Sequence, residues 1–453
     1  MKNILILGAG QSSPFLITYM LEQAEKYDWF VTVADYDYDS ACKKVFDHPK
    51  GKAVQFDVND ENLRNTLIEK SDIVINFLAP PYQYLIALDC LTHSKHVISA
   101  SYENSRVGLL NNDAKSKGIL ILNEMGLDPG IDHMSAMALI QSVRDKGGYI
   151  SSFVSYGSGV PAPEVNSNPL NYCITWNSRN VVMAGDVGAL YMEEEQMKIL
   201  PYEQLFNRTW SVDVEGVGTF EAYPNRDSLV YKDIFKLGKV KTMIRGTLRY
   251  PGWSETWAQI VKLGFPNEYL KIPNLAEKTY KQFTGMFLPI NANGNKLEPR
   301  IANFLKISPT GKIMENLKWL GLFSDEVIGG NVKTAAEVLQ KILTDKMPLP
   351  EGARDMVMLI HEIEAVYPDL KKNVKYTSTL VDYGIPNGIT AIAKTVGAPA
   401  GIAAKLILLG ELKLTGTHIP THPDIYQKVL SELEDLNLKF VEKVEEIEDD
   451  TEN

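Results

Sequence analysis

The segment NEMGLDPGIDHM (123–134) places a cluster of ionisable residues directly after GILIL (118–122), an apolar run that predicts a buried strand. These residue types accept and release protons in enzymes. Asp128 precedes Pro129, which disfavours helical backbone there and lets the carboxylate face a crevice. The same Asp-Pro-Gly sequence also fits an Asx turn or a helix cap with no chemical role. The ionisable members of the cluster are Glu124, Asp128, Asp132 and His133.

The other members of this cluster are expected to hold the turn rather than react. IDHMSAMALIQSV (131–143) has the apolar spacing of a helix, and Asp132 at its start fits a cap. His133 is interpreted as structural, and Glu124 can accept hydrogen bonds from backbone N–H groups across the turn. The cluster therefore combines one or two reactive groups with supporting ones.

A second chemical signal is Gly8-Ala9-Gly10, between the apolar run NILILG (3–8) and a helix predicted over 14–27. Glycines at such a turn let the backbone approach a pyrophosphate, which the N-terminus of the next helix attracts. Asp35 ends the second predicted strand, where a ribose 2′-OH would lie. The motif lacks the third glycine of G-x-G-x-x-G. The turn could also exist without a ligand, and Asp35 could cap the following helix.

The surrounding elements alternate between strand and helix. Apolar runs predict strands over 3–8, 29–35, 52–58, 71–80, 95–102 and 118–124. This pattern predicts an α/β fold with a Rossmann-like, doubly wound parallel sheet. Ligands of such sheets bind at the carboxyl ends of the strands. The candidate cofactor-binding residues are therefore Gly8, Gly10, Gln11, Ser12, Asp35, Asp57, Val58, Phe77, Ala100, Gly126 and Leu127.

Length and composition set the class of protein. A chain of 453 residues exceeds one ordinary core, so two or three domains are expected. The net charge of −11 argues against nucleic acid and anionic membranes as partners. Three cysteines without C-x-x-C spacing, and no signal-peptide or membrane-span pattern, predict a cytoplasmic protein. His418 and His422 lack supporting ligands, so a surface loop and no metal site are expected.

Several longer motifs extend from this cluster to the C-terminal part of the chain. Together with NEMGLDPGIDH, they resemble the saccharopine dehydrogenase family, in its L-glutamate-forming type, also called saccharopine reductase. This resemblance implies an NAD(P)-dependent oxidoreductase acting on CH–NH donors in lysine metabolism. It would interconvert saccharopine and water with L-glutamate and 2-aminoadipate 6-semialdehyde. The motifs include SYGSGVPAPEVNSNPLNY (155–172), RGTLRYPG (245–252), LKWLGLFSD (317–325) and TSTLVDYG (377–384).

The resemblance also implies a domain plan and a homodimer. A mixed α/β domain for substrate binding and dimerisation would follow the dinucleotide domain and carry an all-helical insertion. The acidic tail is expected to be disordered. The boundaries are 1–128 for the dinucleotide domain, 129–265 with 351–400 for the mixed domain, 266–350 for the insertion, 401–443 for a C-terminal helical segment and 444–453 for the tail.

Residue roles follow from the reaction that the resemblance implies. Asp128, with Tyr102 as its partner, is predicted to transfer protons at the amine and at the incoming water. The three carboxylates of the substrate need cations, for which Arg226 and Arg245 are the best candidates, with Arg249 nearby. Each arginine could instead form an internal ion pair, for example with Asp227. The substrate-binding residues implied by the resemblance are Ser101, Tyr102, Arg226 and a turn formed by Gly246 and Thr247.

Two positions depart from the family pattern. After the second strand, where the family often has an arginine-containing turn, this chain has three aspartates in VADYDYD (33–39). Carboxylates there would repel a 2′-phosphate, so NAD is predicted to be preferred, with NADP possible as a cofactor. Gly157 replaces a cysteine of relatives, so no thiol acts there. Alternative functions are a dehydrogenase of a polyamine precursor such as carboxynorspermidine, or a non-catalytic dinucleotide-binding dimer.

Overall fold

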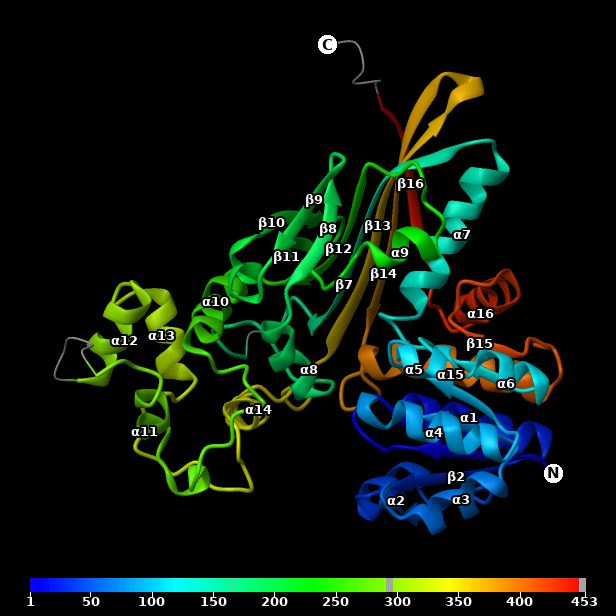
Figure 1. Ribbon diagram of the computed structural model, residues 1–453, viewed down its shortest axis with the longest axis horizontal. Helices are drawn as coiled ribbons and strands as arrows, with labels where there is room; N and C mark the ends of the chain where they lie inside the picture. Colours follow the sequence, from blue (N-terminus) through cyan, green and yellow to red (C-terminus); the bar gives the residue numbers. More distant parts are fainter. Residues whose placement is uncertain (166, 291–295, 448–453) are drawn as a thin grey trace. The chain divides into compact units, whose positions relative to one another are not determined.

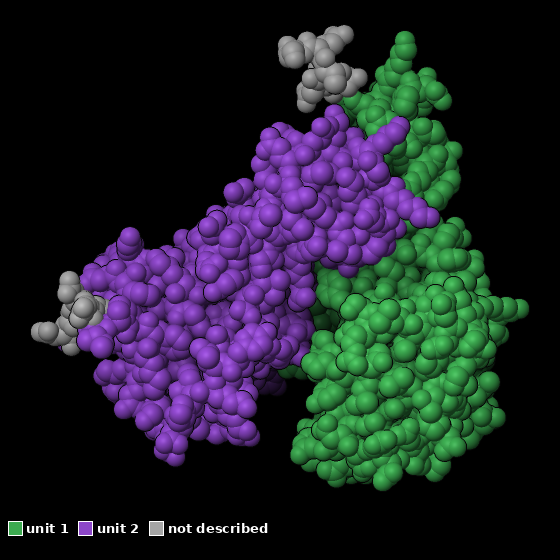
Figure 2. Space-filling model, in the orientation of Figure 1, with its two compact units in different colours: residues 1–150, 365–453 green, residues 151–364 purple. Residues whose placement is uncertain are grey.

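The computed structural model describes residues 1–165, 167–290 and 296–447. The chain divides into two compact units, coloured separately in Figure 2. Unit 1 comprises Met1–Ile150 and Ala365–Asn453, and unit 2 comprises Ser151–Glu364. These units do not follow the predicted domain boundaries, because the chain after residue 364 packs with the N-terminal part.

Unit 1 is built on a sheet with the strand order β15-β6-β5-β4-β1-β2-β3. Figure 1 labels β2 and β15 of this sheet. All neighbouring strands are parallel. Residues 4–7 of β1 are buried, as expected for a central strand covered on both faces. The predicted strands and the α/β class are confirmed. The strands are β1 (Asn3–Leu7), β2 (Phe30–Asp35), β3 (Gly51–Gln55), β4 (Ile73–Asn76), β5 (His96–Ser99), β6 (Leu120–Leu122) and β15 (Gly416–His418).

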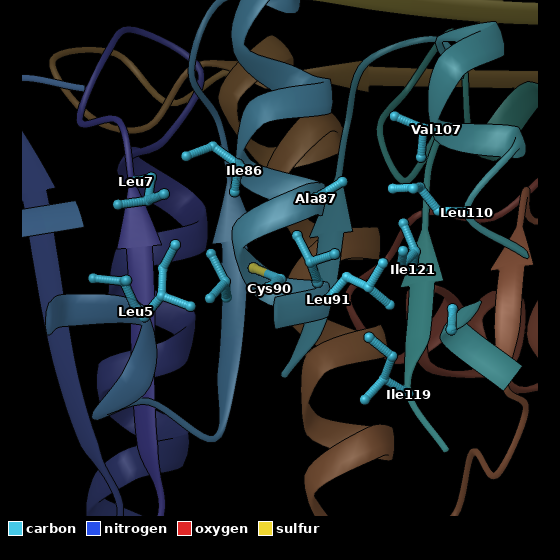
Figure 3. Close-up of a cluster of buried hydrophobic side chains, with 14 of the residues drawn as sticks. Leu5, Leu7, Ile86, Ala87, Cys90, Leu91, Val107, Leu110, Ile119 and Ile121 are labelled. Carbon is cyan, nitrogen blue, oxygen red and sulfur yellow. The ribbon is translucent and has the colours of Figure 1, made fainter. Parts of the chain in front are cut away.

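Helices between these strands cover the sheet. Helix α4 buries the stripe Ile86, Ala87, Cys90 and Leu91 in a cluster that also contains Leu5 of β1 (Figure 3). The i, i+1, i+4, i+5 spacing of this stripe is that of one helix face. The helices are α1 (Pro14–Tyr27), α2 (Tyr38–Val45), α3 (Glu61–Glu69), α4 (Gln83–Thr92), α5 (Ser105–Gly108), α6 (Asn111–Ser116) and α7 (Ile131–Asp145), with the 3-10 turn η1 (Pro80–Tyr82).

The C-terminal part completes unit 1. Helix α15 (Ala391–Leu408) packs against α1, and a Cβ at Gly397 would lie 2.8 Å from the backbone nitrogen of Leu16. Glycine therefore permits the close approach of these two helices. Helix α15 is long and apolar enough to cross a membrane, but 78% of that stretch is buried inside the protein, so it is a core helix. Helix α16 (Pro423–Asp435) packs on α7.

Two expectations about this C-terminal part were wrong. The acidic tail was expected to be disordered from residue 444, but β16 (Val441–Ile447) pairs antiparallel with β14 (Lys372–Tyr383). Backbone pairing there outweighs the polar composition, and residues 448–453 lie outside the described residues. His418 was expected in a loop, but it lies on the edge strand β15, while His422 caps α16.

Unit 2 contains a mixed sheet with the order β10-β11-β12-β7-β13. Strand β12 runs antiparallel to β11 and parallel to β7. The strands are β7 (Tyr149–Pro161), β8 (Ala189–Glu193), β9 (Gln196–Leu200), β10 (Trp210–Val214), β11 (Gly218–Pro224), β12 (Thr242–Arg249) and β13 (Asp355–Tyr367). The helices are α8 (Ser178–Met183), α9 (Val230–Ile234), α10 (Trp253–Leu263), α11 (Tyr280–Gly285), α12 (Leu297–Leu305), α13 (Lys312–Trp319) and α14 (Ala335–Lys346).

Candidate active site

The glycine turn after β1 has two glycines with different functions. Gly8 has a φ of +102°, and a Cβ there would lie 2.7 Å from the carbonyl oxygen of Phe77. Backbone packing therefore requires glycine at this position. A Cβ at Gly10 would meet no described atom within 4 Å, so the space before the N-terminus of α1 is open. That open cradle fits a pyrophosphate, and the exposed Gln11 and half-buried Ser12 border it.

Asp35 holds the glycine turn instead of capping a helix. One carboxylate oxygen accepts a hydrogen bond from the Ala9 N–H, and the other accepts one from the Asp37 N–H at 2.8 Å. The cap of α2 is Asp37, whose side chain accepts from Ser40 N. The helix-cap alternative for Asp35 is therefore wrong.

Lys44 binds the other backbone polar group of Ala9, its carbonyl oxygen. Its Nζ donates to the Ala9 carbonyl oxygen at 2.6 Å and to Ser40 Oγ at 2.8 Å. The Ser40 hydroxyl also donates to the Ala9 carbonyl, at 2.9 Å. Burial lowers the pKa of Lys44, while the charges of Asp35 and Asp37 oppose that shift. The sequence analysis did not single out Lys44, although its i, i+4 spacing from Ser40 is visible in the sequence.

The other predicted cofactor residues lie at the carboxyl ends of the strands. Phe77 follows β4 and donates its N–H to the Leu7 carbonyl at 2.7 Å. Gly126 lies against Ala100, whose Cβ would be 3.3 Å from a Cβ at that glycine. Asp57 is exposed and accepts from Asn59 N at 2.9 Å, as in an Asx turn. Of the remaining two, Val58 is buried and accepts a hydrogen bond from Arg64 through its carbonyl, and Leu127 is buried.

Tyr102 and Asp128, the two predicted catalytic residues, lie next to each other. The Tyr102 hydroxyl donates to Asp128 Oδ1 at 2.8 Å, and both side chains are partly exposed. Tyr102 follows β5 and Asp128 follows β6, so neighbouring parallel strands bring them together. Ser101 precedes the tyrosine and donates its N–H to Ser99 Oγ. A partly exposed carboxylate can exchange protons with a bound amine or water.

The rest of the ionisable cluster supports this pair from within the fold. Glu124 Oε1 accepts from the backbone N–H of Glu103 at 2.9 Å, which confirms the expected backbone bond. His133 is buried between Glu124 and Asp132, in agreement with a structural role. The cap of α7 is Gly130 rather than Asp132, whose Oδ1 accepts from the Gly130 N–H at 2.7 Å.

The predicted carboxylate-binding arginines lie in unit 2. Arg226 is exposed and has a φ of +53°, and its carbonyl accepts from Leu190 N at 2.9 Å. Arg245 is buried on β12, with its guanidinium 4.5 Å from the ring centre of Tyr231. Gly246 and Thr247 were expected in a turn, but both lie within β12. That expectation was wrong because β12 pairs with β11 and β7 along this stretch.

Arg249 has the most distinctive environment of the three arginines. It is 6% exposed, and the ring centres of Tyr172 and Trp253 lie 4.9 and 5.9 Å from its guanidinium carbon. Its Nη1 donates to the Leu248 carbonyl at 2.8 Å, but its buried Nε has no hydrogen-bond partner among the described residues. Burying such a donor is costly unless a partner arrives. An anionic ligand would supply that partner.

Comparison with known proteins assigns the family. Residues 4–122 match the saccharopine dehydrogenase NADP binding domain, and residues 126–437 match the saccharopine dehydrogenase C-terminal domain. The chain belongs to the saccharopine dehydrogenase family. Tyr102 lies in the first match and Asp128 in the second, so the hydrogen-bonded pair joins the two matched regions.

Full-length relatives and a solved structure support the same family. The chain is 32% identical to saccharopine dehydrogenase [NADP(+), L-glutamate-forming] of Schizosaccharomyces pombe, over 98% of this chain and 99% of the relative. The Saccharomyces cerevisiae protein of the same name is 33% identical, over 96% and 97%. The structure of apo histidine-tagged saccharopine dehydrogenase (L-Glu forming) from Saccharomyces cerevisiae matches with a TM-score of 0.86 and 31% identity, over 98% of this chain and 100% of that one. The fold is therefore that of a saccharopine dehydrogenase throughout.

Proposed function

We propose that this protein is an L-glutamate-forming saccharopine dehydrogenase of lysine metabolism. It would oxidise the C–N bond of saccharopine to an imine, which water converts to L-glutamate and 2-aminoadipate 6-semialdehyde. The observation that carries the proposal is the Tyr102–Asp128 hydrogen bond at the carboxyl ends of β5 and β6, where the parallel sheet of a dinucleotide-binding fold receives its ligands. The full-length similarity to L-glutamate-forming relatives supports the substrate.

The open cradle at Gly10 would hold the pyrophosphate of a nicotinamide dinucleotide. When bound, the nicotinamide ring supplies the acceptor for the hydride that leaves the carbon next to the substrate nitrogen. The backbone around Gly8 and the N-terminus of α1 would bind the phosphates, with Ala9 oriented by Asp35 and Lys44. Phe77 and Gly126, at the ends of β4 and β6, would border the other end of the cofactor.

NAD is proposed as the better cofactor. The names of the relatives point to NADP, and the N-terminal domain is described as NADP binding. In this chain, Asp35 ends β2 and the exposed Asp37 and Asp39 follow it, where a 2′-phosphate would have to lie. Like charges at such short range disfavour a phosphate dianion. Lys44 lies beside Asp35 and supplies a partial counter-charge. NADP would therefore bind more weakly than NAD but would still bind.

Asp128 is proposed to accept the proton of the substrate amine and later to orient the attacking water. Tyr102 donates a hydrogen bond to one carboxylate oxygen and so fixes the direction of the other. The substrate carboxylates would be bound by Arg226, Arg245 and the unsatisfied Nε of Arg249. Arginine suits this task because its planar fork matches a carboxylate.

The experiment is a substrate screen that follows the absorbance of the reduced cofactor. L-saccharopine should be oxidised with NAD, and less efficiently with NADP. Asp128→Asn should lower kcat by about a hundredfold or more, since it removes an acid–base group, while exposed Asp113→Asn on α6 should not. Faster turnover of carboxynorspermidine would favour the polyamine alternative. Dinucleotide binding without turnover of either substrate would favour the non-catalytic alternative.

Two further expectations stay predictions. The chain is expected to form a homodimer and to be cytoplasmic. Light scattering coupled to size exclusion would measure the first, and fractionation of the source cells would measure the second. A monomer at micromolar concentration would contradict the predicted dimer.

A further inference from the structure

Two adjacent loops of unit 1 carry the proposed catalytic pair. The loop after β5 carries Tyr102, and the loop after β6 carries Asp128. Backbone hydrogen bonds join the loops near the sheet, from Glu124 N to the Ser101 carbonyl at 3.1 Å and from Met125 N to the Ser99 carbonyl at 2.9 Å. These bonds fix the first residues of each loop, but they do not reach the residues that follow Tyr102 and Asp128.

A buried chain of side-chain contacts spans that remaining distance. Glu124 uses one oxygen to accept from Glu103 N at 2.9 Å and the other to contact His133 Nδ1 at 3.0 Å. His133 Nε2 lies 3.2 Å from Asp132 Oδ2, and Asp132 Oδ1 accepts from Gly130 N at 2.7 Å. This series of contacts therefore begins at Glu103, one residue after Tyr102, and ends at Gly130, two residues after Asp128.

His133 is the central link of this chain. Its side chain is 1% exposed, and both ring nitrogens face carboxylates. The imidazole fills the space between the two buried carboxylates and contacts both, so it couples the Glu124 end of these contacts to the Asp132 end. Glu124 has a φ of +61°, a conformation that persists where the surroundings enforce it.

A second set of bonds ties the Tyr102 loop to helix α4. Gln83 donates to Asn123 Oδ1 at 3.0 Å and accepts from Asn104 N at 3.0 Å. Asn123 in turn donates to Glu103 Oε1 at 3.1 Å. These bonds hold the base of the two loops. The Asp128 turn is closed by backbone bonds of its own, such as Ile131 N to the Gly126 carbonyl at 2.9 Å, and the contacts through His133 add a side-chain link from this turn to the Tyr102 loop.

We propose that His133 is a positioning residue that fixes the Tyr102 hydroxyl against Asp128 by holding the two loops together from inside the protein. This inference rests on the proposed function for its kinetic readout. Removing the imidazole would leave a cavity between two buried carboxylates and would let the Gly130 turn shift. A displacement of about 1 Å at a catalytic group is enough to cost about a hundredfold in rate.

The test compares His133→Ala, His133→Gln and Asp132→Asn with wild type and with His96→Asn. His96 is the control because it accepts a hydrogen bond from Leu120 N within the sheet and touches neither loop. In His133→Ala, kcat should fall at least about tenfold, with KM and the dissociation constant of the dinucleotide within about twofold of wild type. His133→Gln, whose amide can still donate to one carboxylate, should recover part of kcat. Asp132→Asn keeps an acceptor for Gly130 N. It replaces His133→Ala in the test if the alanine variant does not fold.

Amide hydrogen exchange gives a readout that needs no substrate. Residues 100–104 and 123–130 should exchange faster in the His133 variants, while the strands β1 and β4 exchange as in wild type. Unchanged kcat and unchanged loop exchange in a folded His133→Ala protein would overturn the inference. Wild-type protein without saccharopine turnover, but with faster loop exchange in the variant, would refute the proposed function and leave the positioning role standing.

Discussion

Asp35 and Lys44 bind the two backbone polar groups of one residue, Ala9. Asp35 accepts from the N–H of Ala9, and Lys44 donates to the Ala9 carbonyl oxygen at 2.6 Å. The two side chains thus orient the central residue of the glycine turn before any ligand arrives. A turn that is already ordered loses less conformational entropy when a dinucleotide binds.

The contribution of Lys44 can be measured by removing its charge. Lys44→Met keeps the length of the side chain but loses its hydrogen bonds to Ala9 and Ser40. A hydrogen bond from a half-buried cation contributes about 1 kcal/mol, which predicts about fivefold weaker binding of NAD. Titration calorimetry with NAD is the measurement. Exposed Lys43→Met on the same helix is the control, and equal affinities of the two variants would contradict the prediction.

Cofactor preference should respond to charge just after β2. Tyr36 is 74% exposed and lies between Asp35 and Asp37. Tyr36→Arg adds a guanidinium there without removing the bonds that Asp35 makes to the turn. The kcat/KM ratio of NADP to NAD should rise about tenfold, the usual effect of one charge-assisted phosphate contact. An unchanged ratio would place the 2′-phosphate away from this segment.

The two glycines of the turn should behave differently on substitution. Gly8→Ala places a Cβ 2.7 Å from the Phe77 carbonyl oxygen at a φ of +102° and should destabilise unit 1 by about 2 kcal/mol. Gly10→Ala meets no described atom and should leave the free energy of unfolding nearly unchanged while weakening dinucleotide binding. Urea unfolding and calorimetry separate the two effects. A Gly10 variant with normal NAD affinity would contradict the pyrophosphate site.

Arg249 should contribute to substrate affinity. Arg249→Gln removes a buried cation whose Nε lacks a partner among the described residues, so KM for saccharopine should rise about tenfold or more. The exposed Arg208→Gln, also in unit 2, is the control. Equal KM values in both variants, with both proteins folded, would show that Arg249 serves packing against its aromatic neighbours instead.

Stability should depend on pH through His96. Burial, with the nearby charge of Lys2 adding to it, lowers the pKa of this histidine, whose Nδ1 accepts from Leu120 N at 3.0 Å. The unfolded chain, with a histidine pKa of about 6.5, therefore binds the proton first, and the free energy of unfolding falls as pH drops below that value. His96→Asn keeps an acceptor but does not titrate. Its unfolding free energy should fall less than that of wild type between pH 7 and about 5.5.

The central strands of unit 1 could be predicted because they are buried on both faces. A parallel strand covered by helices leaves a continuous apolar run, as in residues 4–7 and 73–75, and such a run is visible locally. The glycine turn and the acidic residue after β2 were also visible. Resemblance pointed to Tyr102 and Asp128, which the structure places in contact, while their catalytic role stays a prediction.

Other features depend on partners that lie far along the chain. Strand β15 pairs with β6, as in Gly416 with Leu120, and nothing local marks Gly416 as the start of a strand in the first sheet. Helix α15 was predicted as a helix but was assigned to the mixed domain and the C-terminal segment. Its apolar pattern shows that it is buried but does not show which surface it packs against. Lys44 was missed for the same reason, since its partner Ala9 is a backbone carbonyl 35 positions away.

The return of the C-terminal part to unit 1 has a consequence for synthesis on the ribosome. When residue 150 has emerged, the face of α1 that meets Gly397 and the edge of β6 that meets β15 are both uncovered. At translation rates of about 5–20 residues per second, their partners follow only after tens of seconds. During that interval the nascent chain exposes an apolar helix face and an unpaired strand edge, and both kinds of surface promote aggregation.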